Sequence, residues 1–277
     1  MWITDIFEVI GDINELFVGI NTLQTQDCFP KNKDEIFKLT ETINSLLDRL
    51  EDAVLREKQF TSDASHELRT PLSIIKGTLE VLIRKPRETG YYENKITYCI
   101  SEVDRISGLI DQLLMLARYE SGNLVPIIRN IDLTESINYC ILRLGEYAAD
   151  HGIKINYEDV RKIPVKADNS MLDLILENLI SNSIKYSGES KEIQIEVHVI
   201  GEETTCMIKD KGIGMKEEQL TRVFDRFYRS DEARSSQIGG HGIGLAIVKR
   251  LADVQNISII FESKPLKGTT AILKFNS

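Results

Sequence analysis

The sequence predicts a two-part fold, in which helices come first and a layered α/β domain follows. Apolar residues return every three or four positions over two long stretches, at about 39–82 and 96–117, which is typical of amphipathic helices. After residue 126 the pattern changes, because Ile193 and Ile195 alternate with polar neighbours as in a half-buried strand. We therefore expect an α plus α/β fold: a dimeric helical hairpin that forms a four-helix bundle, followed by an α/β sandwich domain.

The first predicted helices belong to an N-terminal segment, residues 1–50. Apolar residues at helical spacing occupy 6–20, a polar break containing Pro30 follows, and the stepping resumes at Leu39. This second pattern continues to Leu82, where Lys85, Pro86 and Gly90 supply a break. Its first part, at 39–54, is a coiled-coil seam, and such a seam requires a partner helix.

The next helix runs antiparallel to the first and ends near Gly122. Two helices joined by a short turn form a hairpin. The seam at 39–54 and the apolar stripes of the hairpin need a partner surface. We therefore expect two chains to associate as a homodimer. We expect the hairpin domain at residues 51–122.

The α/β domain is expected at residues 127–277. Helical spacing recurs within it between segments that read as strands, and such alternation favours helices layered on a sheet. The helical patterns lie at 134–150, 168–187 and 243–254, and the strand patterns at 193–199, 257–259 and 269–275.

Composition excludes several classes of protein. The 277 residues include 43 Asp and Glu against 34 Lys and Arg, a net charge of −9, which argues against a general nucleic-acid binder. The four cysteines are scattered, without the close Cys and His spacing of a zinc site, so a reduced, cytosolic chain is expected. No apolar run approaches the roughly 18 residues that span a bilayer.

His66 is the first candidate for chemistry. At about 100° per residue it lies near 200° from the apolar stripe that includes Ala64, so it faces solvent. On position alone, such a histidine is most often a solvated or structural side chain. Pro71 changes that reading, because it removes a backbone donor and leaves the carbonyl of Glu67 without its usual partner. Such a local defect is costly unless it serves a function.

The segment 60–72, Phe-Thr-Ser-Asp-Ala-Ser-His-Glu-Leu-Arg-Thr-Pro-Leu, resembles the phosphoacceptor box of bacterial two-component sensor histidine kinases. The resemblance implies that His66 is the nucleophile that takes the γ-phosphoryl group of ATP. It implies that Glu67 orients the imidazole ring and accepts its proton. Thr70 matches the residue that positions water in members that also act as phosphatases.

A second candidate site begins on the helix at 168–187. Asn178, Asn182 and Lys185 fall within about 60° on a helical wheel, so two amides and a cation share one face. Amide oxygens suit Mg²⁺, and an ammonium group suits phosphate. Taken alone, such a stripe is more often a solvated surface.

Two glycine-rich segments follow. Asp210-Lys211-Gly212-Ile213-Gly214 places a carboxylate before a flexible turn, although in isolation the pattern fits an ordinary turn. The segment 239–245 leads into a helix, where bare amides suit phosphate, but it has no Gly-Lys-Ser/Thr ending and is not a P-loop.

The order of these segments resembles the N, G1, F and G2 boxes of histidine kinases, at 177–187, 210–214, 224–228 and 240–245. The resemblance implies the ATP-binding fold shared with gyrase, Hsp90 and MutL. By that match Asn178 and Asn182 serve Mg²⁺ and phosphate, Lys185 serves phosphate, Tyr186 borders the nucleotide and Asp210 reads adenine. The pocket and its lid are shaped by Gly212, Gly214, Gly240, Gly242, Gly244 and Leu245.

Three further expectations concern this region. The lid between Met215 and Gly239 is expected to be mobile, given the polar run 229–237. Arg226 either reaches the phosphates or makes a structural salt bridge. His241 stands where Ser or Thr is more usual in the family, and no role is assigned to it.

Residues 1–50 resemble, more loosely, a HAMP signalling module. Such a module usually follows a transmembrane helix, which this sequence lacks. We therefore expect the cytoplasmic part of a membrane sensor, attached through a segment outside this chain; a soluble cytoplasmic protein is the alternative.

The function expected from the resemblance is ATP-dependent autophosphorylation on His66, with Mg²⁺, followed by transfer to an aspartate of a response regulator receiver domain. Phosphatase activity toward that regulator is allowed. Two alternatives remain open: a non-catalytic dimeric relay that only binds ATP, and a protein serine kinase of the same ATP-binding fold.

Overall fold

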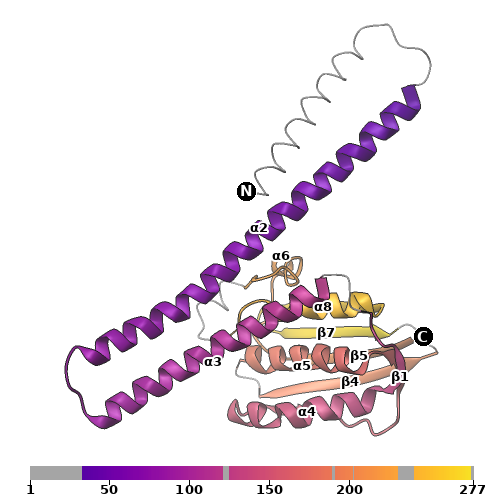
Figure 1. Cartoon of the computed structure of the whole chain (residues 1–277). Coiled ribbons are helices and arrows are strands. Elements are labelled where there is room, and N and C mark those ends of the chain that lie inside the picture. Colours follow the sequence, from indigo (N-terminus) through magenta and orange to yellow (C-terminus); the bar gives the residue numbers. More distant parts are fainter. Residues whose placement is uncertain (1–32, 121–124, 189–190, 202, 230–239, 276–277) are drawn as a thin grey trace. The chain divides into compact units, whose positions relative to one another are not determined.

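A computed structural model describes residues 33–120, 125–188, 191–201, 203–229 and 240–275 (Figure 1). The chain divides into two compact units at residue 63, and helix α2 (Lys33–Ile83) extends through that boundary. The helix expected at 6–20 lies outside the described residues, as do residues 230–239 of the expected lid. Within the described part, no helix is both long and apolar enough to cross a membrane.

The helical hairpin consists of the second half of α2 and of α3 (Thr89–Glu120). Helix α2 continues through Pro71, which is buried. The turn occupies residues 84–88, and Gly90, expected in the break, instead lies in the first turn of α3. That helix begins early because the carbonyl of Glu88 accepts hydrogen bonds from the backbone of Tyr91 and Tyr92. Buried side chains on these two helices include Leu82, Cys99, Leu109 and Leu116, and α3 also contacts α8.

The α/β domain is built on a five-stranded sheet with the order β2-β4-β5-β7-β6. Strand β2 pairs parallel with β4, and the other pairs are antiparallel. A separate two-stranded antiparallel sheet joins β1 to β3. The strands are β1 (Arg129–Asp132), β2 (Lys154–Asn156), β3 (Pro164–Ala167), β4 (Glu192–Ile200), β5 (Glu203–Asp210), β6 (Ile257–Lys264) and β7 (Gly268–Phe275).

Three helices cover one face of the five-stranded sheet (Figure 1): α4 (Leu133–Asp150), α5 (Asn169–Tyr186) and α8 (Gly244–Val254). Helix α5 contacts α4, α8 and β5, so it is the central helix of the layer. It buries Leu172, Ile175, Leu176 and Ile180 completely. A fourth, short helix is α6 (Glu217–Leu220). The predicted fold class is confirmed: a helical hairpin precedes an α/β layered domain.

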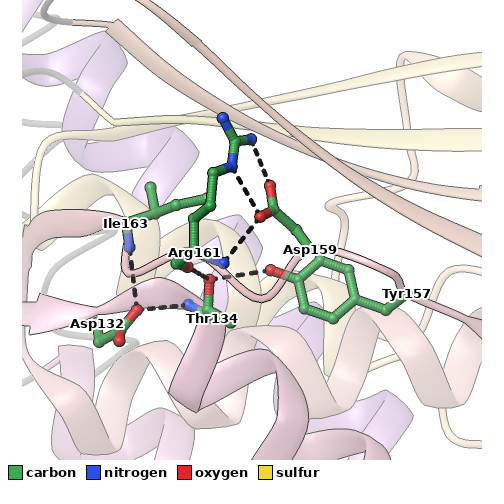
Figure 2. A network of polar contacts seen from close by, with 6 residues as sticks. All are labelled: Asp132, Thr134, Tyr157, Asp159, Arg161 and Ile163. Atoms are coloured by element: carbon green, nitrogen blue, oxygen red, sulfur yellow. Dashed lines mark hydrogen bonds and ion pairs between the residues drawn. The ribbon is translucent and has the colours of Figure 1, made fainter.

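A polar network fixes the segment 157–163 to the start of α4 (Figure 2). Asp132 caps that helix, and its Oδ1 accepts hydrogen bonds from the backbone of Thr134 at 3.0 Å and of Ile163 at 3.1 Å. The Thr134 hydroxyl donates to the carbonyl of Arg161 at 2.6 Å and accepts from the Tyr157 hydroxyl at 3.1 Å. These bonds place β3, which leads directly into the Asp168 cap of α5.

Candidate active site

A cavity opens between α5, the end of β5 and the start of α8. Its walls mix apolar side chains with a few polar groups, as ligand pockets commonly do. Helix α5, β7 and the segments after β5 supply most of the wall. The lining residues are Leu179, Asn182, Ser183, Tyr186, Asp210, Ile213, Gly214, Met215, Gln219, Val223, Tyr228, Arg229, Leu245, Phe261, Thr269 and Ala271.

Asp210 reaches the cavity because of the strand period. Alternate residues of β5 face the helical layer, and these positions end with the carboxylate of Asp210. Its Oδ1 accepts hydrogen bonds from the backbone N–H of Gly212 at 2.9 Å and of Thr269 at 3.0 Å. Burial raises the pKa of Asp210, while these two bonds and one from the Ser183 hydroxyl act in the opposite direction. A buried carboxylate held in this way can accept a hydrogen bond from an exocyclic amine.

Gly212 is required by the close approach of two segments. A Cβ built on this residue would lie 1.8 Å from the carbonyl oxygen of Tyr186. The same carbonyl accepts a hydrogen bond from the backbone N–H of Ile213 at 3.1 Å. Glycine therefore lets the turn after Asp210 close against the end of α5.

The polar face of α5 points toward the cavity and toward α8. Asn182 and Tyr186 line the cavity, whereas Lys185 is half-buried beside it. Burial, and then the neighbouring charge of Arg229, lower the pKa of Lys185. Asn178 donates through Nδ2 to the carbonyl of Leu174 at 2.8 Å, and its Oδ1 lies against Gly244, where a Cβ would approach within 2.6 Å.

The glycine loop before α8 packs against the segment 224–228. Gly242 has a φ of +72°, and a Cβ there would come within 2.7 Å of the carbonyl oxygen of Tyr228. The carbonyl of Gly242 accepts a hydrogen bond from the backbone N–H of Phe227 at 2.9 Å. Gly240 belongs to the same loop, and of the expected G2 residues Leu245 lines the cavity.

Of two nearby arginines, Arg229 lines the cavity and Arg226 does not. The positive charge of Arg229 lies close enough to contribute to the pKa values of Lys185, Tyr186 and Glu67. Arg226 was expected either to reach the phosphates or to make a structural salt bridge, whereas no role was expected for Arg229. The sequence offered one signal for Arg229, because it directly follows Tyr228, which also lines the cavity.

The three residues of the expected phosphoacceptor box lie on one turn of α2. His66 is exposed, as the helical wheel predicts. The Thr70 hydroxyl donates to the carbonyl of His66 at 3.2 Å. Glu67 lies within hydrogen-bond distance of the glycine loop, because the Nδ1 of His241 donates to its Oε2 at 3.3 Å. The turn of α2 that carries His66 therefore adjoins the glycine loop beside the cavity.

The comparison with protein families settles the class of protein. Residues 56–122 match the His Kinase A (phospho-acceptor) domain, and residues 167–277 match the histidine kinase-, DNA gyrase B-, and HSP90-like ATPase. The chain belongs to the sensor histidine kinase family. Its two matched regions are the helical hairpin and the part of the α/β domain that contains the cavity, so the latter is an ATP-binding domain.

Curated relatives support this assignment. The signal transduction histidine-protein kinase ArlS of Staphylococcus aureus is 31% identical over 240 residues, which cover 86% of this histidine kinase chain. The match covers 53% of ArlS, so the chain spans about half the length of the curated relatives it matches.

Solved histidine kinase structures share the fold. The Acinetobacter baumannii histidine kinase AdeS superposes with a TM-score of 0.61 at 22% identity, over 76% of this chain and 97% of that one. Histidine kinase ThkA, solved in complex with the response regulator protein TrrA, gives a TM-score of 0.66 at 20% identity, over 89% of this chain and 68% of ThkA.

Proposed function

We propose that this histidine kinase uses ATP to phosphorylate His66 and then passes the phosphoryl group to an aspartate of a separate response regulator. The observation that supports this best is the adjacency of the two sites: the ATP cavity and its glycine loop lie beside the helix turn that presents His66. Phosphoryl transfer mainly requires positioning and charge stabilisation, which such an arrangement can supply.

In the first step, a lone pair of the neutral His66 imidazole attacks the γ-phosphorus of ATP. A P–N bond forms, the bond between the γ-phosphorus and the bridging oxygen breaks, and ADP leaves. The ring then has a proton too many, and Glu67, its helix neighbour, accepts that proton. The exposed position of His66 lets the ring approach the phosphate.

In and beside the ATP cavity we assign roles to four residues. Asp210 accepts a hydrogen bond from the exocyclic amine of adenine, and Tyr186 borders the base. Lys185 and Arg229 face the phosphates as cations. In the second step, the phosphoryl group moves from the His66 nitrogen to a carboxylate oxygen of the regulator. The P–N bond breaks, a P–O bond forms, and the aspartate becomes an acyl phosphate.

Mg²⁺ would be held by the amide oxygens of Asn178 and Asn182 together with the phosphates. The donor set fits, because amide oxygens are hard ligands and the side chain of Asn178 turns its Oδ1 toward the glycine loop. Among the described residues no three His, Cys, Asp or Glu side chains gather as a metal site. Bound Mg²⁺ would screen the phosphate charges and orient the transferring group.

The proposed partners are a second copy of this chain and a response regulator. Large apolar side chains are exposed along α2 and α3 of a single chain, as a bundle of two hairpins requires. The solved complex of ThkA with TrrA is a precedent for the regulator. We place the kinase at the cytoplasmic side of the cell membrane, where ATP is supplied.

The test is incubation of the purified chain with Mg²⁺ and γ-labelled ATP, beside His66→Gln and Asn182→Ala. We expect label in the parent only, and the label should be lost in acid yet stable in alkali, as a phosphoramidate is. Acid-stable label would instead indicate a serine kinase. ATP binding without any label would indicate the non-catalytic relay.

A phosphatase activity toward the regulator is a further part of this proposal, and it rests on Thr70. Its hydroxyl lies one turn from His66 and could hold water after giving up its bond to the His66 carbonyl. Thr70→Ala should keep the labelling of His66 and slow the loss of phosphate from the regulator. An equal rate of loss in Thr70→Ala and the parent would contradict this role.

A further inference from the structure

One hydrogen bond joins the glycine loop to the phosphoacceptor helix. The Nδ1 of His241 lies 3.3 Å from the Oε2 of Glu67, across 174 positions of sequence. The His241 side chain is 9% exposed and that of Glu67 is 35% exposed, so the bond is partly shielded from water. Both residues belong to the same compact unit.

The carboxylate of Glu67 is surrounded by positive or donating groups. His241 faces it from the glycine loop, Arg105 from α3, and Arg229 from the segment after Tyr228. The pKa of Glu67 is lowered, chiefly by the hydrogen bond from His241 and against the effect of burial. The carboxylate is therefore ionised, and it is a weaker proton acceptor while this bond lasts.

The bond also commits an oxygen of Glu67 to the glycine loop. Successive side chains on a helix diverge by about 100°, so the carboxylate must swing toward His66 before it can take a proton from that ring. An oxygen that accepts from His241 opposes this movement. While the bond is closed, the Glu67 carboxylate is held by His241, although the proton transfer requires it to meet the His66 ring.

We propose that His241 is a positioning residue that holds the carboxylate of Glu67 away from His66 until the glycine loop shifts. This inference rests on the proposed function, because it assigns a regulator to the proton acceptor of the same reaction. The latch, meaning the His241 to Glu67 hydrogen bond, slows autophosphorylation while it is closed. Its release makes Glu67 available to the His66 ring.

The surroundings of His241 connect the latch to the nucleotide cavity. The neighbouring residue, Gly242, packs against the backbone of Phe227 and Tyr228, and Tyr228 lines the cavity. A nucleotide that displaces Tyr228 therefore also displaces the loop that holds His241. This packing is the route by which we expect ATP binding to release Glu67.

The kinetic test compares rates of His66 labelling at saturating ATP. His241→Ala should label roughly fivefold faster than the parent, as expected for the loss of one modest hydrogen bond. His241→Gln keeps an N–H donor and should stay near the parental rate. His198→Ala is the matched control, because this exposed histidine lies on β4 beside Glu196 and should leave the rate unchanged.

A spectroscopic test examines the bond itself. The chain has four histidines, so a protein labelled with ¹⁵N only in histidine gives few imidazole resonances. The resonances of His241 should move in Glu67→Gln, while those of His151 and His198 should not.

Two results would overturn the inference: a labelling rate in His241→Ala equal to or below the parental rate, or His241 resonances unchanged by Glu67→Gln. If the parent itself binds ATP but is never labelled, the proposed function fails, and the role of His241 fails with it. If the parent is labelled but His241→Ala is labelled no faster, the latch alone is overturned and the proposed function stands.

Discussion

Asp210 and Thr269, 59 positions apart in the sequence, are joined by a hydrogen bond of 3.0 Å from the Thr269 backbone N–H to the Asp210 Oδ1. The bond links the end of β5 to the start of β7. Because Gly212 donates to the same oxygen at 2.9 Å, one carboxylate oxygen stabilises the floor of the cavity. The hydrogen-bonding positions of the carboxylate that these two bonds do not use face Ser183 and the nucleotide site.

Asp210→Asn should separate stability from nucleotide binding. The amide Oδ1 can still accept both backbone hydrogen bonds, so the fold is kept. The amide NH₂ cannot accept from the exocyclic amine of adenine, and ATP affinity should fall roughly 100-fold, the cost of a hydrogen bond to a charged group. Calorimetric titration measures this, and an affinity within threefold of the parent would refute the role of Asp210.

The same substitution should change how stability depends on pH. Because the pKa of Asp210 is raised above its usual 3.8, the folded chain keeps a proton that the unfolded chain loses as the pH rises past 3.8. The parent therefore loses stability across this window, until the pH exceeds the folded pKa. Asp210→Asn lacks this loss, so the difference between its unfolding free energy and that of the parent should shift in favour of the variant as the pH rises above 3.8, until the folded pKa is passed. A constant difference in urea denaturation would contradict this.

Gly212→Ala should destabilise the ATP-binding domain. The added methyl group would lie 1.8 Å from the carbonyl oxygen of Tyr186, so the turn after Asp210 or the end of α5 must shift. We expect a cost of about 2–3 kcal/mol, typical of overpacking, together with weaker ATP binding. Gly145→Ala is the control: it lies within α4 with nothing within 4 Å of the added atom, and alanine should stabilise that helix by up to about 1 kcal/mol. Equal melting temperatures for the two variants would disprove this account.

Dimerisation should depend on the exposed apolar stripe of α3. Val103 is 50% exposed and Ile110 is 43% exposed in a single chain. A double substitution, Val103→Glu with Ile110→Glu, should convert a dimer into a species of 31.5 kDa in light scattering. Ile260→Glu provides the control, since Ile260 is 42% exposed on β6 and outside the hairpin. A parent that is already monomeric at micromolar concentration would refute the prediction.

Cys206 should resist thiol reagents until the domain unfolds. Burial raises the pKa of its thiol to about 12, against a usual value of 9.0, and the side chain is fully buried. At pH 8 the thiolate fraction is then about a thousandfold lower than that of an ordinary cysteine. Mass spectrometry after iodoacetamide treatment should find this residue modified only in denaturant. Modification under native conditions at the denatured rate would contradict the burial.

Periodicity predicted the regular elements well. The expected helix at 243–254 is α8 (Gly244–Val254), and the alternating segment at 193–199 lies within β4 (Glu192–Ile200). These elements bury one face each, so their side chains repeat with the period of the backbone. Strands β1, β2 and β3 were not predicted, because three or four residues each are too few to show an alternation.

Contacts between distant segments could not be predicted from spacing. Nothing along α2 indicates that Glu67 accepts a hydrogen bond from His241, because spacing within one element does not reveal which loop packs against it. Arg229 was missed for a related reason. Phe227, just before it, has a φ of +59°, so the chain changes direction there and no helical or strand period assigns sides to the arginines at 226 and 229.

The most direct test of the central claim is to locate the phosphoryl group. The chain is incubated with ATP and Mg²⁺, digested at alkaline pH, and analysed by tandem mass spectrometry with electron-transfer fragmentation. We predict one phosphorylated peptide, with the phosphate on the imidazole of His66, and no such peptide in Asn182→Ala. Phosphate on a serine or threonine, or on another of the four histidines, would contradict the account.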